Sequence, residues 1–261
     1  MNYIGIDIGS TCAKTVVLNE KKEIIREFVQ PTGWSSVDTA EEIRQKLELS
    51  GINLSDDSSC CVATGYGRIS VPYADKTVTE ITCHALGAVH LFQQPDLTVI
   101  DIGGQDTKII QIEQGFVKDF IMNDKCAAGT GRFLDVMAGV LEVKVQDLGH
   151  LDSLSKKRVE ISSTCTVFAE SEVISQLSMG TDKCDIIAGI HRSVAHRVTG
   201  LAHRIGVVPA LVMTGGVAQN EGVVKALQNE LGCEIHRSPL TQYNGALGAA
   251  LYAYQAASRR A

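Results

Sequence analysis

The chain has 261 residues, of which 44% are hydrophobic, 5% are aromatic and 24 are glycines, and its formal net charge at pH 7 is -6. This length suits one large domain or two modest ones, and the composition favours an α/β protein over an aromatic-rich β-sandwich. The negative charge, together with the lack of any long basic run, excludes a general nucleic-acid-binding surface.

The N-terminus begins directly on an apolar strand pattern, which predicts that there is no secretory signal. No apolar stretch approaches the roughly 20 residues that a membrane helix needs. We therefore expect a cytoplasmic protein. In that compartment the eight cysteines are expected to be thiols or metal ligands and not disulfides.

The first part of the chain reads as a β-meander that leads into alternating helices and strands. A glycine and hydroxyl turn, Gly9-Ser10-Thr11, follows the first strand. The predicted elements are strands at 3–8, 13–18 and 23–29, a helix at 37–49, a strand at 60–64 and a helix at about 81–91.

The opening theme then returns 94 positions later, from Asp7 to Asp101. The later elements are strands at 97–102, 108–113 and 116–122, a helix at about 131–141, a helix that follows Cys165 and reaches Leu177, and a strand that begins at Leu211. A repeat at a domain-sized interval predicts two related α/β lobes with mixed sheets, packed around a shared cleft. We expect a first lobe of residues 1–95 plus 246–261 and a second lobe of residues 96–245.

An aspartate at a strand end followed by a glycine turn is suited to hold a metal–phosphate unit. Asp7 can bind a hydrated Mg²⁺, and Asp101 can grip the other side of the phosphates. Glycines let the backbone approach, while amides and hydroxyls donate to phosphate oxygens. The residues predicted around the phosphates are Gly9, Ser10, Thr11, Cys12, Ala13, Lys14, Gly103, Gly104 and Gln105.

A third element, Leu211 to Asn220, reads as a buried strand, the diglycine turn Gly215-Gly216 and the start of a helix. This turn allows close approach of an adenosine moiety. The three motifs, in this order, resemble phosphate 1, phosphate 2 and adenosine of the actin, hexokinase and Hsp70 superfamily. The resemblance implies two RNase H-like lobes with a nucleotide cleft between them.

Other nucleotide contacts are less defined by the sequence. Gln105 can orient a water at the γ-phosphate or be a simple turn residue. Lys14 can reach a phosphate as a point charge or cap its hairpin. Further adenine contacts are expected from loop or helix ends, at Asp147, Gln219 and Gln242.

Two cysteines differ from the others because each precedes a predicted helix. Cys126 and Cys165 would lie where backbone amides and the helix dipole stabilise a thiolate, which an iron–sulfur cluster requires. Spacing alone leaves a purely structural role open, and two thiolates complete a four-cysteine site only in a homodimer. The remaining cysteines are expected to pack as small hydrophobes: Cys12, Cys60, Cys61, Cys83, Cys184 and Cys233.

Distinctive segments lie at residues 63–68, 103–106, 123–131, 162–172 and 242–249. Together they resemble one family, the ATPases that activate (R)-2-hydroxyacyl-CoA dehydratases, which also includes the ATP-binding subunits of benzoyl-CoA reductase. The resemblance spans essentially the whole chain.

The resemblance implies a homodimer that bridges one [4Fe–4S] cluster through Cys126 and Cys165 of both subunits. It implies an oxygen-sensitive ATPase of anaerobes that passes one electron, received from reduced ferredoxin or flavodoxin, to a separate dehydratase. The expected substrate of that dehydratase is 2-hydroxyglutaryl-CoA of amino-acid fermentation.

Two other kinds of protein compete with this interpretation. A small-molecule kinase of the same superfamily would need an acidic base at an acceptor hydroxyl, and none stands out in the sequence. An ATP-hydrolysing subunit of a benzoyl-CoA-reductase-like system stays open. A filament or chaperone component would leave Cys126 and Cys165 unexplained.

Overall fold

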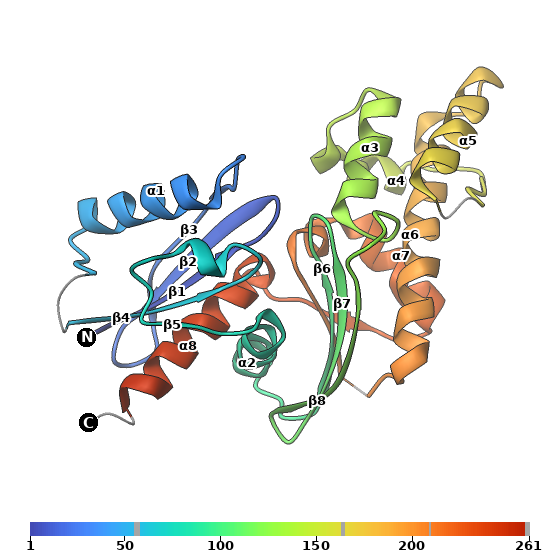
Figure 1. The fold of residues 1–261 in the computed structure, drawn as a ribbon. Helices are drawn as coiled ribbons and strands as arrows, with labels where there is room; N and C mark the ends of the chain where they lie inside the picture. Colours follow the sequence, from blue (N-terminus) through green and yellow to red (C-terminus); the bar gives the residue numbers. More distant parts are fainter. Residues whose placement is uncertain (55–57, 163–164, 209, 259–261) are drawn as a thin grey trace. The chain divides into compact units, whose positions relative to one another are not determined.

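Two five-stranded sheets organise the chain (Figure 1), which divides into two compact units. A computed structural model describes residues 1–54, 58–162, 165–208 and 210–258. The first unit comprises Met1–Asp96, Ile112–Val117 and Ser238–Ala261, and the second comprises Leu97–Gln111 and Lys118–Arg237. No described helix is long and apolar enough to cross a membrane.

The first sheet has the strand order β3-β2-β1-β4-β5. Its strands are β1 (Asn2–Ile8), β2 (Cys12–Leu18), β3 (Ile24–Pro31), β4 (Ser59–Thr64) and β5 (Lys76–Thr77). β1 pairs antiparallel with β2 and parallel with β4, so Asp7 lies between Lys14 on one side and Thr64 on the other. The predicted β-meander is confirmed. The two-residue β5 is too short to carry a periodic signal.

Helices cover both faces of this sheet (Figure 1). They are α1 (Ser36–Leu49), α2 (Glu80–Phe92) and α8 (Asn244–Ser258). One face of β1 packs with α1 through Ile4, Ile6 and Ile8, and the other packs with α8. A Cβ at Gly5 would overlap the α8 backbone, so glycine is what allows that close packing. Burial on both faces explains why β1 reads as an unbroken apolar run.

The second sheet repeats that order as β10-β9-β6-β7-β8. Its strands are β6 (Leu97–Ile102), β7 (Thr107–Glu113), β8 (Phe116–Asn123), β9 (Leu211–Thr214) and β10 (Ile235–His236). β6 pairs parallel with β9, in a register that places Asp101 opposite Thr214. β6 thus occupies the place of β1, and β9 the place of β4.

The helices of the second unit form one large apolar core with its sheet. They are α3 (Gly131–Leu141), α4 (Leu148–Ser153), α5 (Thr166–Ser178), α6 (Lys183–Ile205) and α7 (Glu221–Leu231). The predicted bounds of α3 are confirmed, and the helix predicted after Cys165 ends one residue later than expected, at Ser178. α6, the longest helix, and α8 were not identified from the sequence pattern.

Candidate functional site

The turn between β1 and β2 is closed by a backbone hydrogen bond from Gly9 N to Cys12 O (3.1 Å). Thr32, which directly follows β3, stabilises this turn with two hydrogen bonds. Its hydroxyl donates to Gly9 O (2.7 Å) and its backbone amide donates to Thr11 O (3.0 Å). Ser10 and Thr11 are exposed at the tip. The hairpin therefore presents hydroxyl and amide donors on a fixed backbone, as a phosphate site requires.

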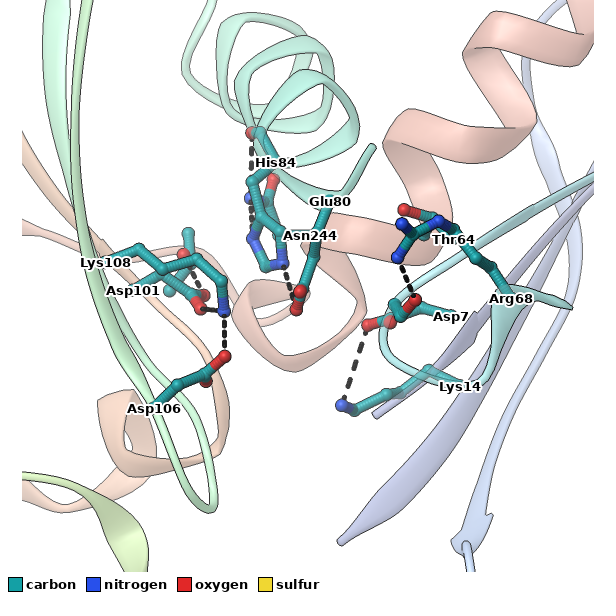
Figure 2. A network of polar contacts seen from close by, with 12 residues as sticks. Asp7, Lys14, Thr64, Arg68, Glu80, His84, Asp101, Asp106, Lys108 and Asn244 are labelled. Atoms are coloured by element: carbon teal, nitrogen blue, oxygen red, sulfur yellow. Dashed lines mark hydrogen bonds and ion pairs between the residues drawn. The ribbon is translucent and has the colours of Figure 1, made fainter. Parts of the chain in front are cut away.

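Asp7 ends β1 beneath this turn and is only 3% exposed. Its Oδ2 lies 3.6 Å from Nζ of Lys14, which faces it on β2 and keeps 18% of its side chain exposed (Figure 2). Its Oδ1 is buried and has no hydrogen-bond partner in the described part of the chain. An unsatisfied buried carboxylate oxygen is costly. This donor fits a hydrated Mg²⁺, which takes few protein ligands.

Three further polar residues lie near Asp7 in the first unit (Figure 2). A Cβ at Gly245 would lie 2.9 Å from Asp7 Oδ2 and 3.0 Å from His84 Nε2. The amide of Asn244 donates to His84 O (3.0 Å), and His84 Nε2 lies 3.8 Å from Glu80 Oε1. The sequence pattern singles out none of Glu80, His84 and Asn244, because they come from two helices separated widely in sequence.

The turn between β6 and β7 has the same backbone closure, from Gly103 N to Asp106 O (2.9 Å). Asp101 is 2% exposed and both of its carboxylate oxygens face partners: Thr214 Oγ1 donates to Oδ1 (2.7 Å), and Lys108 Nζ lies 3.6 Å from Oδ2. Lys108 also pairs with Asp106 at 2.8 Å (Figure 2). Gln105 is exposed at the tip of this turn and does not pack in the core.

The sequence motifs do not include Lys108, although the internal repeat identifies it. The interval of 94 that relates Asp7 to Asp101 also relates Lys14 to Lys108. In both hairpins the lysine Nζ lies 3.6 Å from an aspartate Oδ2. The repeat therefore extends from the aspartate to its cation.

The diglycine turn follows β9 as predicted. Gly215 has φ +86°, and a Cβ there would overlap the backbone of Ile102, so only glycine fits. Gly216 is exposed and begins a short 3₁₀ turn, Gly216–Gln219, before Asn220 caps α7 through its side-chain oxygen. The helix that was expected directly after the diglycine thus begins at Glu221.

The three predicted adenine contacts fall in different units. Asp147 and Gln219 are both exposed in the second unit, where α4, which follows Asp147, packs against α7. Gly149 approaches Asn220 closely, since a Cβ there would lie 3.1 Å from Asn220 Oδ1. Gln242 is half-buried in the first unit, in the 3₁₀ turn Thr241–Tyr243.

The two candidate cluster cysteines lie in different settings. Cys165 is exposed and is the N-cap residue of α5, as expected. Cys126 is half-buried in the loop after β8, four residues before Thr130, the N-cap of α3. The prediction that both thiols lie at helix N-termini is therefore wrong for Cys126. Ser163 and Thr164, part of the motif around Cys165, lie outside the described residues.

The loop that carries Cys126 is fixed by hydrogen bonds to its surroundings. Asn123 Nδ2 donates to Cys126 O (2.8 Å) and to Ala128 O (3.0 Å), and Thr107 Oγ1 donates to Gly129 O (2.6 Å). The first amides of α3, on Gly131 and Arg132, donate to Gly103 O (2.9 Å) and Gly104 O (2.7 Å). The start of α3 is thus hydrogen-bonded to the turn between β6 and β7.

The remaining cysteines divide into two groups. Cys60, Cys61 and Cys83 are buried, as predicted, and burial raises the pKa of the Cys83 thiol to about 12. Cys12 and Cys184 are half-buried, and Cys233 is exposed, so packing as a buried hydrophobe is wrong for Cys233. Among the described residues, no group of three or more His, Cys, Asp or Glu side chains is arranged to hold a metal ion.

The duplicated sheets and their paired Asp hairpins define the class as the actin, hexokinase and Hsp70 fold. A ROK family glucokinase from Streptomyces griseus shares this fold, with a TM-score of 0.62 at 16% identity, covering 98% of this chain and all of that one.

The family follows from closer matches. The BadF/BadG/BcrA/BcrD ATPase family model matches residues 4–253, and the chain belongs to this family. The (R)-2-hydroxyglutaryl-CoA dehydratase activating ATPase of Acidaminococcus fermentans is 59% identical over 98% of both chains. The activator of the 2-hydroxyisocaproyl-CoA dehydratase from Clostridium difficile, solved with bound ADPNP, has a TM-score of 0.93 at 46% identity, covering 100% of this chain and 97% of that one.

A more distant relative belongs to a different enzyme system. It is a benzoyl-CoA reductase component of Thauera aromatica, 31% identical over 95% of this chain and 91% of its own length.

Proposed function

We propose that this chain is an ATP-hydrolysing activator that passes one low-potential electron to a 2-hydroxyacyl-CoA dehydratase. The observation that carries the proposal is the pair of hydrogen bonds from Gly131 N and Arg132 N to Gly103 O and Gly104 O. They join the phosphate turn directly to the helix that follows the Cys126 loop. A change in that turn on ATP binding or hydrolysis is therefore transmitted to Cys126 over a few bonds.

Each of the two units offers groups that suit a nucleotide, and we propose them as its contacts. Ser10, Thr11 and the turn amides donate to phosphate oxygens, and Asp7 supplies the carboxylate for Mg²⁺. Gln105, exposed at the tip of its turn, is suited to orient the attacking water. Gly215 and Gly216 leave room for the adenosine, with Asp147, Gln219 and Gln242 as candidate contacts of the base.

A [4Fe–4S] cluster fits the donor set only across two copies of the chain. One chain offers the exposed Cys165 and the half-buried Cys126, which is half of a four-cysteine site. We infer a homodimer in which Cys126 and Cys165 of each copy hold one cluster. When bound, the cluster supplies one-electron redox chemistry at low potential. The α5 amides that follow Cys165 favour negative charge near its sulfur.

The partner is a separate dehydratase component in the cytoplasm, with reduced ferredoxin or flavodoxin as the electron donor. The 59% identity to an activating ATPase of 2-hydroxyglutaryl-CoA dehydratase favours that acyl-CoA as the partner's substrate. The 31% identity to a benzoyl-CoA reductase component makes that alternative weaker. A small-molecule kinase would give no role to an exposed cysteine at the start of α5.

The first experiment is purification of the full-length protein without oxygen, followed by iron analysis, gel filtration and ATPase assay. We expect a brown dimer with about four iron atoms, the content of one [4Fe–4S] cluster. It should hydrolyse ATP and activate a purified 2-hydroxyglutaryl-CoA dehydratase in the presence of a reductant. An iron-free, colourless protein with full ATPase activity contradicts the redox part of the proposal.

A matched pair of variants tests the ligands. Cys165 and Cys233 are both exposed, so their substitution by alanine perturbs the core equally little. Cys165→Ala should lose the iron and the ability to activate the dehydratase, whereas Cys233→Ala should keep both. Cys126→Ala should behave as Cys165→Ala does. Equal iron content in the Cys165 and Cys233 variants would show that the ligand assignment is wrong.

A further inference from the structure

Asp101 is held from two directions by side chains that belong to different strands. Thr214 on β9 donates to Oδ1 at 2.7 Å, and Lys108 on β7 lies 3.6 Å from Oδ2. We call Lys108 and Thr214 the Asp101 clamp. Asp101 and both residues of the clamp are almost completely buried, and only 1% of the Lys108 side chain is exposed. The orientation of the Asp101 carboxylate is therefore fixed by the fold.

Burial of a lysine is expensive unless its charge is compensated. Lys108 has two carboxylates beside it, Asp101 and Asp106, the second at 2.8 Å. Removing one partner of such a buried group leaves uncompensated charge, so each charge holds the others in place. Because Asp106 also closes the turn through its carbonyl to Gly103 N, Lys108 ties the carboxylate of Asp101 to the turn that carries Gln105.

The counterpart in the first hairpin is arranged differently. Lys14 lies at the same 3.6 Å from Asp7, but 18% of its side chain is exposed. At the place of Asp106 the first hairpin has Cys12, which has no carboxylate to draw the ammonium inward. The place of Thr214 is taken by Thr64, whose hydroxyl donates to Val78 O (2.9 Å). The Lys14 side chain is therefore more exposed than that of Lys108.

We propose that Lys108 is a positioning residue for ATP hydrolysis, which acts by fixing Asp101 and the Gly103–Gln105 turn, while Lys14 is the lysine that contacts a phosphate. This inference rests on the proposed ATPase function. A lysine that would have to leave two carboxylates to reach a ligand contributes through geometry and not through binding. Its loss should therefore lower kcat and leave nucleotide affinity nearly unchanged.

The test compares four variants of the cluster-loaded dimer: Lys108→Met, Lys14→Met, Thr214→Val and Thr64→Val. Each is measured for ATPase kcat and KM, for ADP Kd by calorimetry, and for its unfolding temperature. Lys108→Met should lower kcat about a hundredfold, as loss of a preorganised electrostatic group does, with ADP Kd within about threefold of the wild type. Lys14→Met should raise ADP Kd about tenfold, the loss of one charge-assisted hydrogen bond.

The threonine pair decides the matter if Lys108→Met does not fold. Both threonines are buried at matching positions, but only Thr214 contacts an aspartate. Thr214→Val should lower kcat about tenfold without a change in ADP Kd, and Thr64→Val should leave both unchanged. The clamp is overturned if the two variants have equal kcat, or if Lys108→Met raises ADP Kd as Lys14→Met does. A wild type that does not hydrolyse ATP contradicts the proposed function instead.

Discussion

The β1–β2 hairpin and the β6–β7 hairpin have the same backbone arrangement but differ in the contacts of their aspartate carboxylates. Both have an Asp at the end of a central strand, a glycine turn closed by one hydrogen bond, and a lysine 3.6 Å from the carboxylate. Asp7 nevertheless keeps a buried oxygen without a partner among the described residues, whereas both oxygens of Asp101 face partners. Duplication preserved the geometry and allowed the chemistry to diverge.

The difference between the two aspartates has two causes: one hydrogen bond and one substitution. The threonine that ends each parallel neighbour strand bonds Val78 O in one unit and Asp101 in the other. The last residue of the turn is Cys12 in one hairpin and Asp106 in the other. We infer that the first carboxylate is left available for a metal, while the second is held by Thr214 and Lys108.

The largest effect that would separate the hairpins is expected from the aspartates themselves. Asp7→Asn should lower ATPase kcat/KM on the order of a thousandfold, because the amide cannot supply charge to Mg²⁺. It should also raise the Mg²⁺ concentration for half-maximal activity about tenfold or more. Asp101→Asn should reduce kcat/KM less and leave the Mg²⁺ requirement nearly unchanged. A Mg²⁺ titration of both variants that gives the same shift would show that the two carboxylates have the same role.

The next effect concerns the glycines that follow the parallel neighbour strands. Gly65 and Gly215 have φ of +82° and +86°, and a Cβ would overlap Asp7 Oδ1 in one case and the Ile102 backbone in the other. Alanine at either position should lower the free energy of unfolding by at least about 2 kcal/mol, measured in urea.

The control for these glycines is Gly33→Ala. Gly33 has φ +61°, but a Cβ there would meet no atom within 4 Å, so only the backbone cost of about 1 kcal/mol applies. If all three alanine variants are destabilised equally, the close packing at Gly65 and Gly215 contributes nothing. Gly65→Ala should in addition raise the Mg²⁺ concentration for half-maximal ATPase activity, because the alanine Cβ would displace the Asp7 carboxylate.

The smallest effect is expected from a substitution that makes the first hairpin resemble the second. Cys12→Asp places a carboxylate beside Lys14, as Asp106 stands beside Lys108, and should draw the ammonium from the phosphates. We expect ADP Kd to rise about threefold to tenfold by calorimetry. Cys12→Ser changes the side chain without adding charge and should have the smaller effect. The opposite order of the two Kd values would contradict the role of Lys14.

Much of the frame was predictable because it depends on local patterns. The strands of both hairpins and the bounds of α3 follow from apolar runs, glycine turns and helical spacing. The sequence pattern did not predict α6, because this helix buries polar residues whose partners lie far away in sequence. His191 on α6 is fully buried against Asp152 (2.6 Å), and Asp185 accepts from the amides of Lys156 (2.6 Å) and Lys157 (2.8 Å), which hold the pKa of Asp185 below its ordinary value.

The sequence by itself determined the duplicated aspartate hairpins, the diglycine strand end and the two distinctive cysteines, because each is a short segment with its own chemistry. Only the tertiary structure decided which carboxylate is held and which is left open. That outcome depends on Thr214 and Lys108 meeting Asp101 from two other strands, and on Thr64 turning to Val78 instead of Asp7. Contacts between strands distant in sequence are set by sheet register, which no local pattern contains.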